Sequence, residues 1–279
     1  MRQRIIIRGI VQGVGFRPFI YNLAHRFTLA GFVCNRTGDV LIEIEGPSSD
    51  VESFKRLIQI EAPSLSLIES MDCEEIDEAG DTHFVIQESE SVADELVFIS
   101  PDLATCEDCL REFFDRTDRR YHYPFLNCTN CGPRLTIIQS APYDRERTTM
   151  SAFTMCESCQ AEYDDPTDRR FHAQPTACSK CGPHLSSLPE SDSPLLTMTR
   201  ALVGGKIVAL KGLGGYHLCC DARSEETVLR LRQRKHREEK PFAIMLRDLD
   251  QVRNFCEVNE IEAKMLTAPS RPIVLLKKQ

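Results

Sequence analysis

Eight cysteines stand in the middle of the 279-residue chain as four Cys-x2-Cys pairs. Two pairs are separated by 18 residues, and the same arrangement returns 50 residues later. The ligand candidates are Cys106, Cys109, Cys128 and Cys131 in the first set and Cys156, Cys159, Cys178 and Cys181 in the second. Four thiolates complete a tetrahedral Zn²⁺ site and leave no open position for a substrate. We therefore expect two structural zinc ions, whether neighbouring pairs close each site or pairs cross between the sets.

The cysteine sets belong to an internal repeat. Residues 106–135 align with 156–185 without a gap, and fifteen of the 30 positions are identical, which indicates a duplicated module. The repeated arginines either bind an anion or nucleic acid, or pair with adjacent aspartates and carry the modules against their neighbours: Arg119, Arg120, Arg169 and Arg170. Since each set already offers four cysteines, His122 and His172 are expected to pack or lie on the surface.

A glycine-containing loop forms the second candidate site. It consists of Val11, Gln12, Gly13, Val14, Gly15, Phe16 and Arg17 and follows a β-rich segment at 4–10. Two glycines allow positive φ, so successive N–H groups can curl around an anion, and a following helix adds its N-terminal dipole. Arg17 offers a planar fork that fits two phosphate oxygens. The alternative is a tight turn with a surface arginine.

The third candidate site is cationic. Its residues are Lys211, beside a glycine-rich turn at 212–215, and Lys235, Arg237 and Lys240 further along. In an acidic protein such a cluster suggests a polyanion, either a triphosphate or RNA. The alternative is a solvated helix end, where basic residues favour the dipole.

Apolar periodicity indicates the elements that position these residues. In the first 88 residues it predicts strands at 4–10, 32–35, 40–45 and 83–88, with helices at 18–30 and 51–60. That order is β-α-β-β-α-β, the ferredoxin-like arrangement. Residues 63–82 contain many acids and are expected to be partly loop.

The last third of the chain is predicted to be α/β. After a polar linker at 186–194, it shows helices at 197–203, 225–234 and 248–257 and strands at 206–210, 241–246 and 272–276. The chain stops three residues after a core-type strand, so we expect a truncated domain there.

Composition narrows the class of protein. Hydrophobic residues make up 42% and charged residues 27%, as in a soluble globular protein, and the net charge is −8. This charge opposes bulk attraction to nucleic acid or an anionic membrane. No apolar run reaches the length of a membrane span, and arginines at 2, 4 and 8 interrupt any signal peptide. We therefore expect a cytoplasmic protein.

Residues 11–19 (VQGVGFRPF) and 31–40 (GFVCNRTGDV) resemble the acylphosphatase family, small βαββαβ enzymes that hydrolyse acyl phosphates. The resemblance implies that residues 1–91 form such a domain. It also implies that Arg17 binds the phosphoryl group and that Asn35 positions the attacking water. On a modular view, this chemistry would persist when the cysteine modules are disrupted.

Residues 207–222 (IVALKGLGGYHLCCDA) and 232–245 resemble the YrdC-like domain, a fold that binds ATP and makes acyl-adenylates. Its basic elements map to Lys235, Arg237, Lys240 and Pro241. Residues 195–279 cover only the first half of that fold, and its later Ser/Thr-Asn-rich motif is absent from the chain.

The order of the parts resembles the hydrogenase maturation carbamoyltransferases of the HypF family. The expected architecture is α+β and multidomain, with an acylphosphatase-like domain at 1–91, tandem four-cysteine zinc fingers at 101–185 and a YrdC-like part at 195–279. The resemblance implies that carbamoyl phosphate is cleaved and that the full-length protein uses ATP to form carbamoyl-adenylate. The carbamoyl group then passes to a C-terminal cysteine of a HypE-type partner and becomes a cyanide ligand of the [NiFe] centre.

Three alternatives remain open from the sequence. The zinc modules and the YrdC-like part would also suit a nucleic-acid-binding regulator, which the net charge disfavours. The first domain could be a general acylphosphatase for acetyl-type substrates. A non-catalytic scaffold is the third, although a scaffold would not need both Arg17 and Asn35.

Overall fold

The computed structural model describes residues 1–90 and 99–279, which form two compact units, Met1–Pro183 and His184–Gln279. The first unit holds both the N-terminal sheet and the cysteine repeats. The predicted boundary at residue 91 lies outside the described residues.

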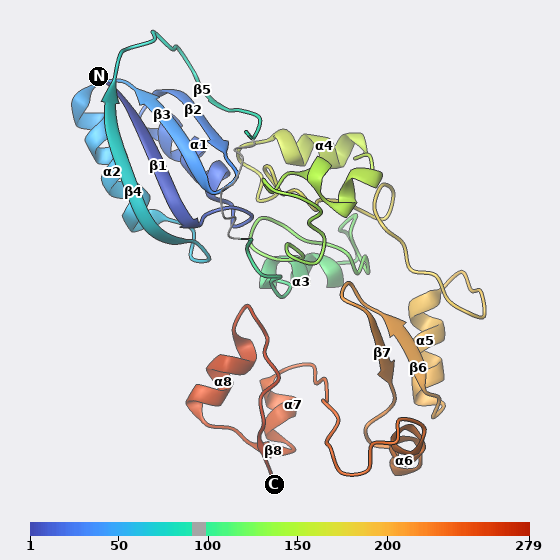
Figure 1. Ribbon diagram of the computed structural model, residues 1–279. Coiled ribbons are helices and arrows are strands. Elements are labelled where there is room, and N and C mark those ends of the chain that lie inside the picture. The colour runs from blue at the N-terminus through green and yellow to red at the C-terminus, as the bar shows by residue number, and fades with distance from the viewer. Residues whose placement is uncertain (91–98) are drawn as a thin grey trace. The chain divides into compact units, whose positions relative to one another are not determined.

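The N-terminal part is a five-stranded sheet in the order β4-β1-β3-β2-β5. Its elements are β1 (Arg2–Ile10), α1 (Phe16–Arg26), β2 (Ala30–Asn35), β3 (Asp39–Glu45), α2 (Ser48–Glu61), β4 (Leu67–Ile76) and β5 (Phe84–Ile86). Both helices cover one face of the sheet (Figure 1). The core between them consists of alternate strand residues and one apolar stripe of each helix, for example Ile5, Ile42, Ile20 and Phe54, all fully buried. The predicted ferredoxin-like fold is confirmed.

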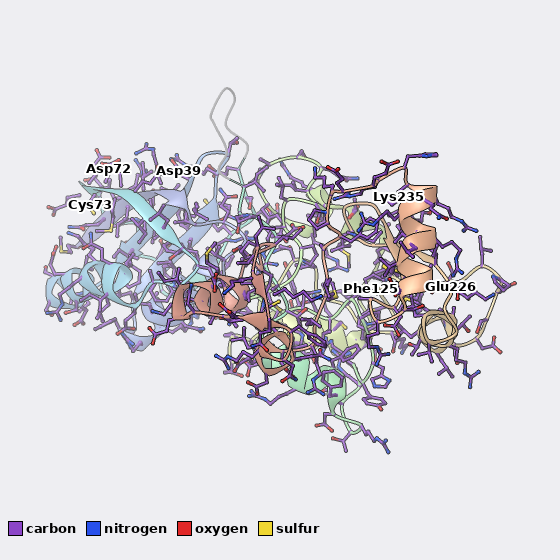
Figure 2. The ribbon with its side chains drawn as sticks, turned by 90° about the horizontal axis from the view of Figure 1, so that it is seen from below. Asp39, Asp72, Cys73, Phe125, Glu226 and Lys235 are labelled. Carbon is purple, nitrogen blue, oxygen red and sulfur yellow. The ribbon has the colours of Figure 1, made fainter. Side chains whose placement is uncertain are left out.

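One strand was predicted wrongly. Strand β4 occupies the acidic segment that the sequence indicated as partly loop, and it pairs antiparallel with β1. Most of its side chains are exposed, so it lacks the apolar alternation that signals a strand. Asp72 lies on this edge strand (Figure 2) and pairs with Arg8 at 2.5 Å. The predicted last strand is β5, a fifth strand that runs parallel to β2.

The cysteine repeats contain little regular structure. Each has one short helix that begins directly after its first cysteine, α3 (Glu107–Phe114) and α4 (Glu157–Asp164). Between the repeats lie two 3-10 turns, η1 (Arg145–Arg147) and η2 (Thr149–Ala152). The modules share a small buried cluster that includes Tyr123, Leu126, Ile137 and Met150 beside the cysteines, and a metal held by the cysteines would add to its stability.

The second unit is α/β, as predicted. It contains α5 (Pro194–Val203), β6 (Val208–Lys211), β7 (Tyr216–Cys219), α6 (Glu225–Arg234), α7 (Leu249–Arg253), β8 (Cys256–Glu257), α8 (Glu260–Thr267) and β9 (Lys277–Lys278). The strands predicted at 241–246 and 272–276 are wrong, since neither segment is paired with a strand of the described residues. Apolar side chains in both remain exposed, such as Met245 and Leu275. No helix in the described ranges has the length and apolarity needed to cross a membrane.

Candidate active site and metal centres

The predicted phosphate loop connects β1 to α1. Gly13 and Gly15 have φ of 71° and 76°, and Gly15 is the residue that caps the helix beginning at Phe16. These angles are those that glycine adopts without strain. The loop therefore has the backbone of an anion nest at a helix N-terminus.

Arg17 and Asn35 line one pocket beside this loop. Arg17 lies in the first turn of α1 and is only 8% exposed. Its guanidinium donates to the Asp144 carboxylate at 2.7 Å and to the Ser89 hydroxyl at 3.2 Å. Asn35, at the end of β2, is 1% exposed, and its Oδ1 is buried with no hydrogen-bond partner among the described residues. A buried acceptor without a partner is suited to a water or a ligand that completes it.

The rest of the pocket comes from the cysteine repeats. They contribute Thr129, Arg134, His172, Ala173, Gln174 and Pro175, and the segment between them contributes Tyr143. These residues and Asp144 lie about 100 to 160 positions from the loop in the sequence, and no spacing signal in the chain marks them. The pocket is therefore shared between the sheet and the repeats, which is at odds with the modular view that residues 1–91 act alone.

His172 has a different setting from its repeat equivalent. Both His172 and His122 have positive φ, 52° and 54°. His122 is exposed, whereas His172 lines the pocket and is half-buried. Burial, together with the nearby Arg17 cation, lowers the pKa of His172 to about 4. It is thus a neutral imidazole at pH 7.

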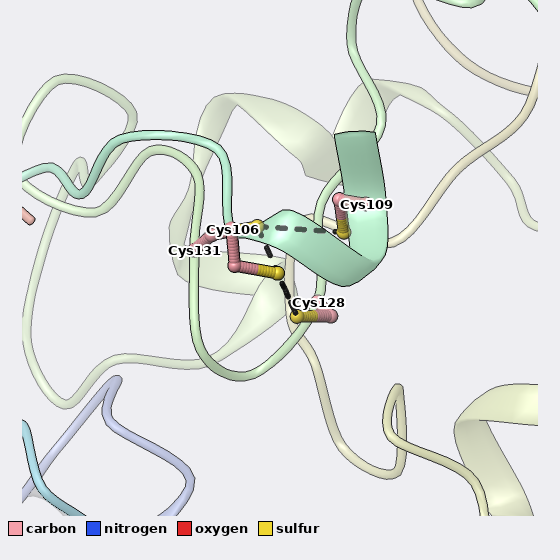
Figure 3. A group of neighbouring side chains, drawn as sticks. All are labelled: Cys106, Cys109, Cys128 and Cys131. Atoms are coloured by element: carbon pink, nitrogen blue, oxygen red, sulfur yellow. Dashed lines mark hydrogen bonds between the residues drawn. The ribbon is translucent and has the colours of Figure 1, made fainter. Parts of the chain in front are cut away.

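The eight repeat cysteines form two groups, and each group is closed within one repeat. In the first group the sulfurs point toward one another, with Cys109 on α3 (Figure 3). The Sγ–Sγ distance is 3.7 Å from Cys106 to Cys128 and 3.8 Å from Cys128 to Cys131. A tetrahedron with Zn–S bonds of about 2.3 Å has edges of roughly 3.8 Å, so these sulfurs fit Zn²⁺. In the second group the equivalent distances are 3.8 Å from Cys156 to Cys178 and 3.8 Å from Cys178 to Cys181.

Each repeat supplies arginines to the other. Arg119 donates to Cys159 Sγ at 3.4 Å, and Arg169 donates to Cys109 Sγ at 3.1 Å. Their neighbours complete the exchange: Arg120 pairs with Glu162 and donates to Ala177 O, while Arg170 pairs with Glu112 and donates to Asn127 O.

These arginines do not pair with the adjacent aspartates, as one sequence-based interpretation had it. Asp118 and Asp168 instead accept from backbone N–H groups two residues on, at Arg120 and Arg170. The arginines do carry the modules against their neighbours, because the residues they contact lie in the other repeat.

The cationic candidates lie in the second unit. Lys211 ends β6 and lies 5.9 Å from the Tyr216 ring centroid. Lys235 follows α6, at the opposite end from Glu226 (Figure 2). Arg237 donates to the Lys240 carbonyl at 3.1 Å, so these two residues share one turn. Their nucleotide-binding role stays a prediction.

Three known families match successive parts of the chain. The acylphosphatase family matches residues 3–86, the HypF finger family matches 105–138 and 155–188, and the telomere recombination family, the YrdC type, matches 200–279. The acylphosphatase of Bacillus subtilis is 44% identical over 64 residues, which cover 23% of this chain and 70% of that protein.

Longer relatives match the chain from end to end. Carbamoyltransferase HypF of Rhizobium leguminosarum bv. viciae is 51% identical over 275 residues, 99% of this chain and 35% of that protein. The protein of the same name from Synechocystis is 48% identical over 99% of this chain and 37% of its own length. The chain thus spans about a third of the length of these relatives.

The fold of the chain also matches a solved structure over its whole length. The crystal structure of full-length HypF in the phosphate- and nucleotide-bound form superposes with a TM-score of 0.96 at 48% identity, covering 100% of this chain and 37% of that one. Sequence, family order and fold agree, and the chain belongs to the HypF carbamoyltransferases, of which it represents the N-terminal portion.

Proposed function

We propose that this chain hydrolyses carbamoyl phosphate at the loop 11–17, the first step of a HypF-type carbamoyl transfer. The observation that carries the proposal is that Arg17 and Asn35 line the same pocket and that Asn35 Oδ1 has no hydrogen-bond partner among the described residues. A phosphoryl-binding cation and a vacant acceptor for water are the two groups that this hydrolysis needs.

The reaction follows from these positions. The phosphoryl oxygens lie against the loop N–H groups and the Arg17 guanidinium, in exchange for part of its contact with Asp144. Asn35 Oδ1 accepts a hydrogen bond from a water and aims its oxygen at phosphorus. The new P–O bond forms as the P–O bond to the acyl group breaks, giving inorganic phosphate and carbamate. Because a mixed anhydride has a good leaving group, orientation and charge stabilisation suffice without a strong base.

The four-cysteine groups each hold one structural zinc ion in this proposal. Bound zinc cross-links the two pairs of each repeat and contributes on the order of 10 kcal/mol to folding. The repeats and the segment between them in turn provide seven of the fifteen residues that line the pocket, so metal binding supports the site indirectly.

The longer protein would consume the carbamate. We infer that ATP converts it to carbamoyl-adenylate at the YrdC-type part, with Lys211, Lys235, Arg237 and Lys240 as the candidate contacts, and that a HypE-type acceptor cysteine receives the carbamoyl group. The support is the family membership and the bound phosphate and nucleotide of the full-length HypF crystal structure. Hydrogenase maturation is then the role of the whole protein.

The deciding experiment measures phosphate release from carbamoyl phosphate by the zinc-loaded chain and by its Arg17→Ala variant, with spontaneous decay subtracted. We expect the variant to lose release above the blank. Acetyl phosphate, measured in parallel, tests the general acylphosphatase alternative: equal kcat/KM for both substrates would favour it. Equal release by wild type and variant would reject hydrolysis at this loop.

A further inference from the structure

The phosphate loop rests on the second cysteine pair of the first repeat. A Cβ atom at Gly13 would lie 3.2 Å from Arg134 Cδ, and one at Gly15 would lie 3.3 Å from Thr129 Cβ. Thr129 stands between the ligand candidates Cys128 and Cys131, and Arg134 follows them by three residues. Both glycines of the loop are therefore in close contact with the same metal-binding turn.

Arg134 makes the polar connection between the two. It is 2% exposed, and its guanidinium donates to Gly13 O at 2.5 Å. The remaining donors go to carbonyls of the cysteine turn: Cys128 at 3.3 Å, Thr129 at 2.8 Å, Cys131 at 2.9 Å and Pro133 at 3.0 Å. Most of the hydrogen bonds of this buried cation are thus made with backbone that the metal shapes.

The contact with Gly13 O acts on the anion site itself. In a trans peptide the C=O and the following N–H point in opposite directions, so fixing Gly13 O also fixes the Val14 N–H. The guanidinium also places a positive charge beside the loop, and Arg134 lines the same pocket as Arg17. Loss of the metal-shaped turn would leave Arg134 without the carbonyls that hold it.

We propose that Arg134 is a positioning residue that joins the first four-cysteine group to the phosphate loop, so that an anion on the loop and zinc in that group stabilise each other. The inference deepens the proposed function and rests on it for the identity of the anion. By linkage, if the metal favours the loop conformation that binds phosphate, phosphate must favour the state that retains the metal.

The second repeat offers an internal comparison. The 50-residue offset places His184 opposite Arg134, and the offset partner of Thr129 is Ser179. Neither is among the described residues that line the pocket. The hydrogen bond to Gly13 O is therefore made by the first repeat, although both repeats have the same four-cysteine group.

The test follows zinc rather than turnover. The full zinc-loaded chain is equilibrated with increasing concentrations of a competing chelator, with and without saturating inorganic phosphate, and the zinc affinity is determined. We expect phosphate to raise the affinity for one of the two zinc ions by about fivefold or more, the lower end of ordinary coupling between sites. Arg134→Ala should reduce that factor to one, Arg134→Lys should retain part of it, and the matched variant His184→Ala should behave as wild type.

A second measurement separates positioning from stability. For Arg134→Ala that still binds two zinc ions, KM for carbamoyl phosphate should rise about tenfold, which corresponds to about 1.4 kcal/mol of lost binding. Should Arg134→Ala fail to load with zinc, the comparison is made on Arg134→Lys. An equal effect of phosphate on zinc affinity in wild type and the variant, or none in wild type, overturns the inference even where Arg17-dependent hydrolysis stands. Absence of that hydrolysis with the Arg134-dependent effect on zinc affinity intact would instead reject the proposed function alone.

Discussion

Arg17 donates to the Asp144 carboxylate across 2.7 Å, although 127 positions separate the two residues in the sequence. The pair brings the first turn of α1 against the segment between the cysteine repeats. It also places a negative charge where a phosphoryl oxygen would approach the same guanidinium. In the proposed reaction Asp144 therefore competes with the phosphoryl group for Arg17.

Replacing Asp144 with asparagine should tighten binding of inorganic phosphate. The variant keeps the side-chain shape but removes the charge that repels the dianion, so the inhibition constant for phosphate should fall about tenfold, or about 1.4 kcal/mol. Competitive inhibition of carbamoyl phosphate hydrolysis measures it, with Asp72→Asn on the exposed edge strand as the control. An unchanged inhibition constant would mean that breaking the Asp144–Arg17 contact does not weaken phosphate binding.

Asn35→Ala should impair the reaction without unfolding the protein. Its Oδ1 has no hydrogen-bond partner within residues 1–90 and 99–279, so the free energy of unfolding should change by no more than about 1 kcal/mol. Without an acceptor to aim the water, kcat should fall about 100-fold while KM changes little. Steady-state kinetics and denaturant unfolding of the same preparation supply both values. A matching rise in KM would assign Asn35 to substrate binding instead.

Arg119→Ala should weaken zinc in the second repeat rather than in its own. The Arg119 guanidinium donates a hydrogen bond to Cys159 Sγ, and the loss of such a partner of a metal ligand typically lowers metal affinity by about 10- to 100-fold. Alkylation of the cysteines, mapped by mass spectrometry, should show faster labelling of Cys159 and its group. Arg169→Ala should give the reciprocal pattern at Cys109, and exposed Arg116→Ala should give neither. Labelling confined to the mutated repeat would contradict the exchange.

His172→Asn should make the protein less sensitive to acid. The folded-state pKa of His172 is about 4, below its ordinary 6.5, so the unfolded chain binds this proton first. The free energy of unfolding of wild type therefore falls as the pH drops from 6.5 to 4, and this part of the loss should vanish in the variant. Asparagine suits the positive φ at this site.

His122→Asn is the matched control, since His122 is exposed at the same position of the first repeat. Acid also protonates the cysteines, and both variants share that loss. Only a difference between the two unfolding profiles, measured by denaturant titration at several pH values, reports on His172. If the two variants have parallel profiles of unfolding free energy against pH, protonation of His172 does not destabilise the folded protein.

How far the sequence predicts this molecule depends on the range of the interaction. The two sets of four cysteines follow from spacing within the chain, although spacing leaves open which pairs close each site. The loop before α1 is a candidate by its glycines and arginine, and the acylphosphatase resemblance favoured a phosphate site there over a simple turn. Strand β4 was not predicted because it shows no apolar alternation. It is held in place by backbone pairing with β1 and by the ion pair of Asp72 with Arg8. The sequence of the strand itself does not reveal backbone pairing or an ion pair with a distant segment.

The part of the pocket that the repeats form could not be predicted from the sequence either. Asp144 and His172 come near Arg17 only because the repeats pack against the sheet, and tertiary contacts over more than a hundred positions leave no periodic signal. The placement of Arg17 and Asn35 in one pocket agrees with the roles inferred from the acylphosphatase resemblance. Those roles stay predictions until the variants are measured.

The exchange of arginines between the repeats has the form of an isologous two-fold interface. These arginine contacts have their counterparts 50 positions away: Arg119 with Cys159 and Arg169 with Cys109, and likewise the glutamate and carbonyl acceptors of Arg120 and Arg170. In such an interface one copy carries both halves of the contact. A single repeat therefore contains what a homodimer of fingers would need, and this chain carries both protomers of such a dimer on one polypeptide. The two copies are free to differ, and the contact with the loop uses Arg134 at a position where the second repeat has His184.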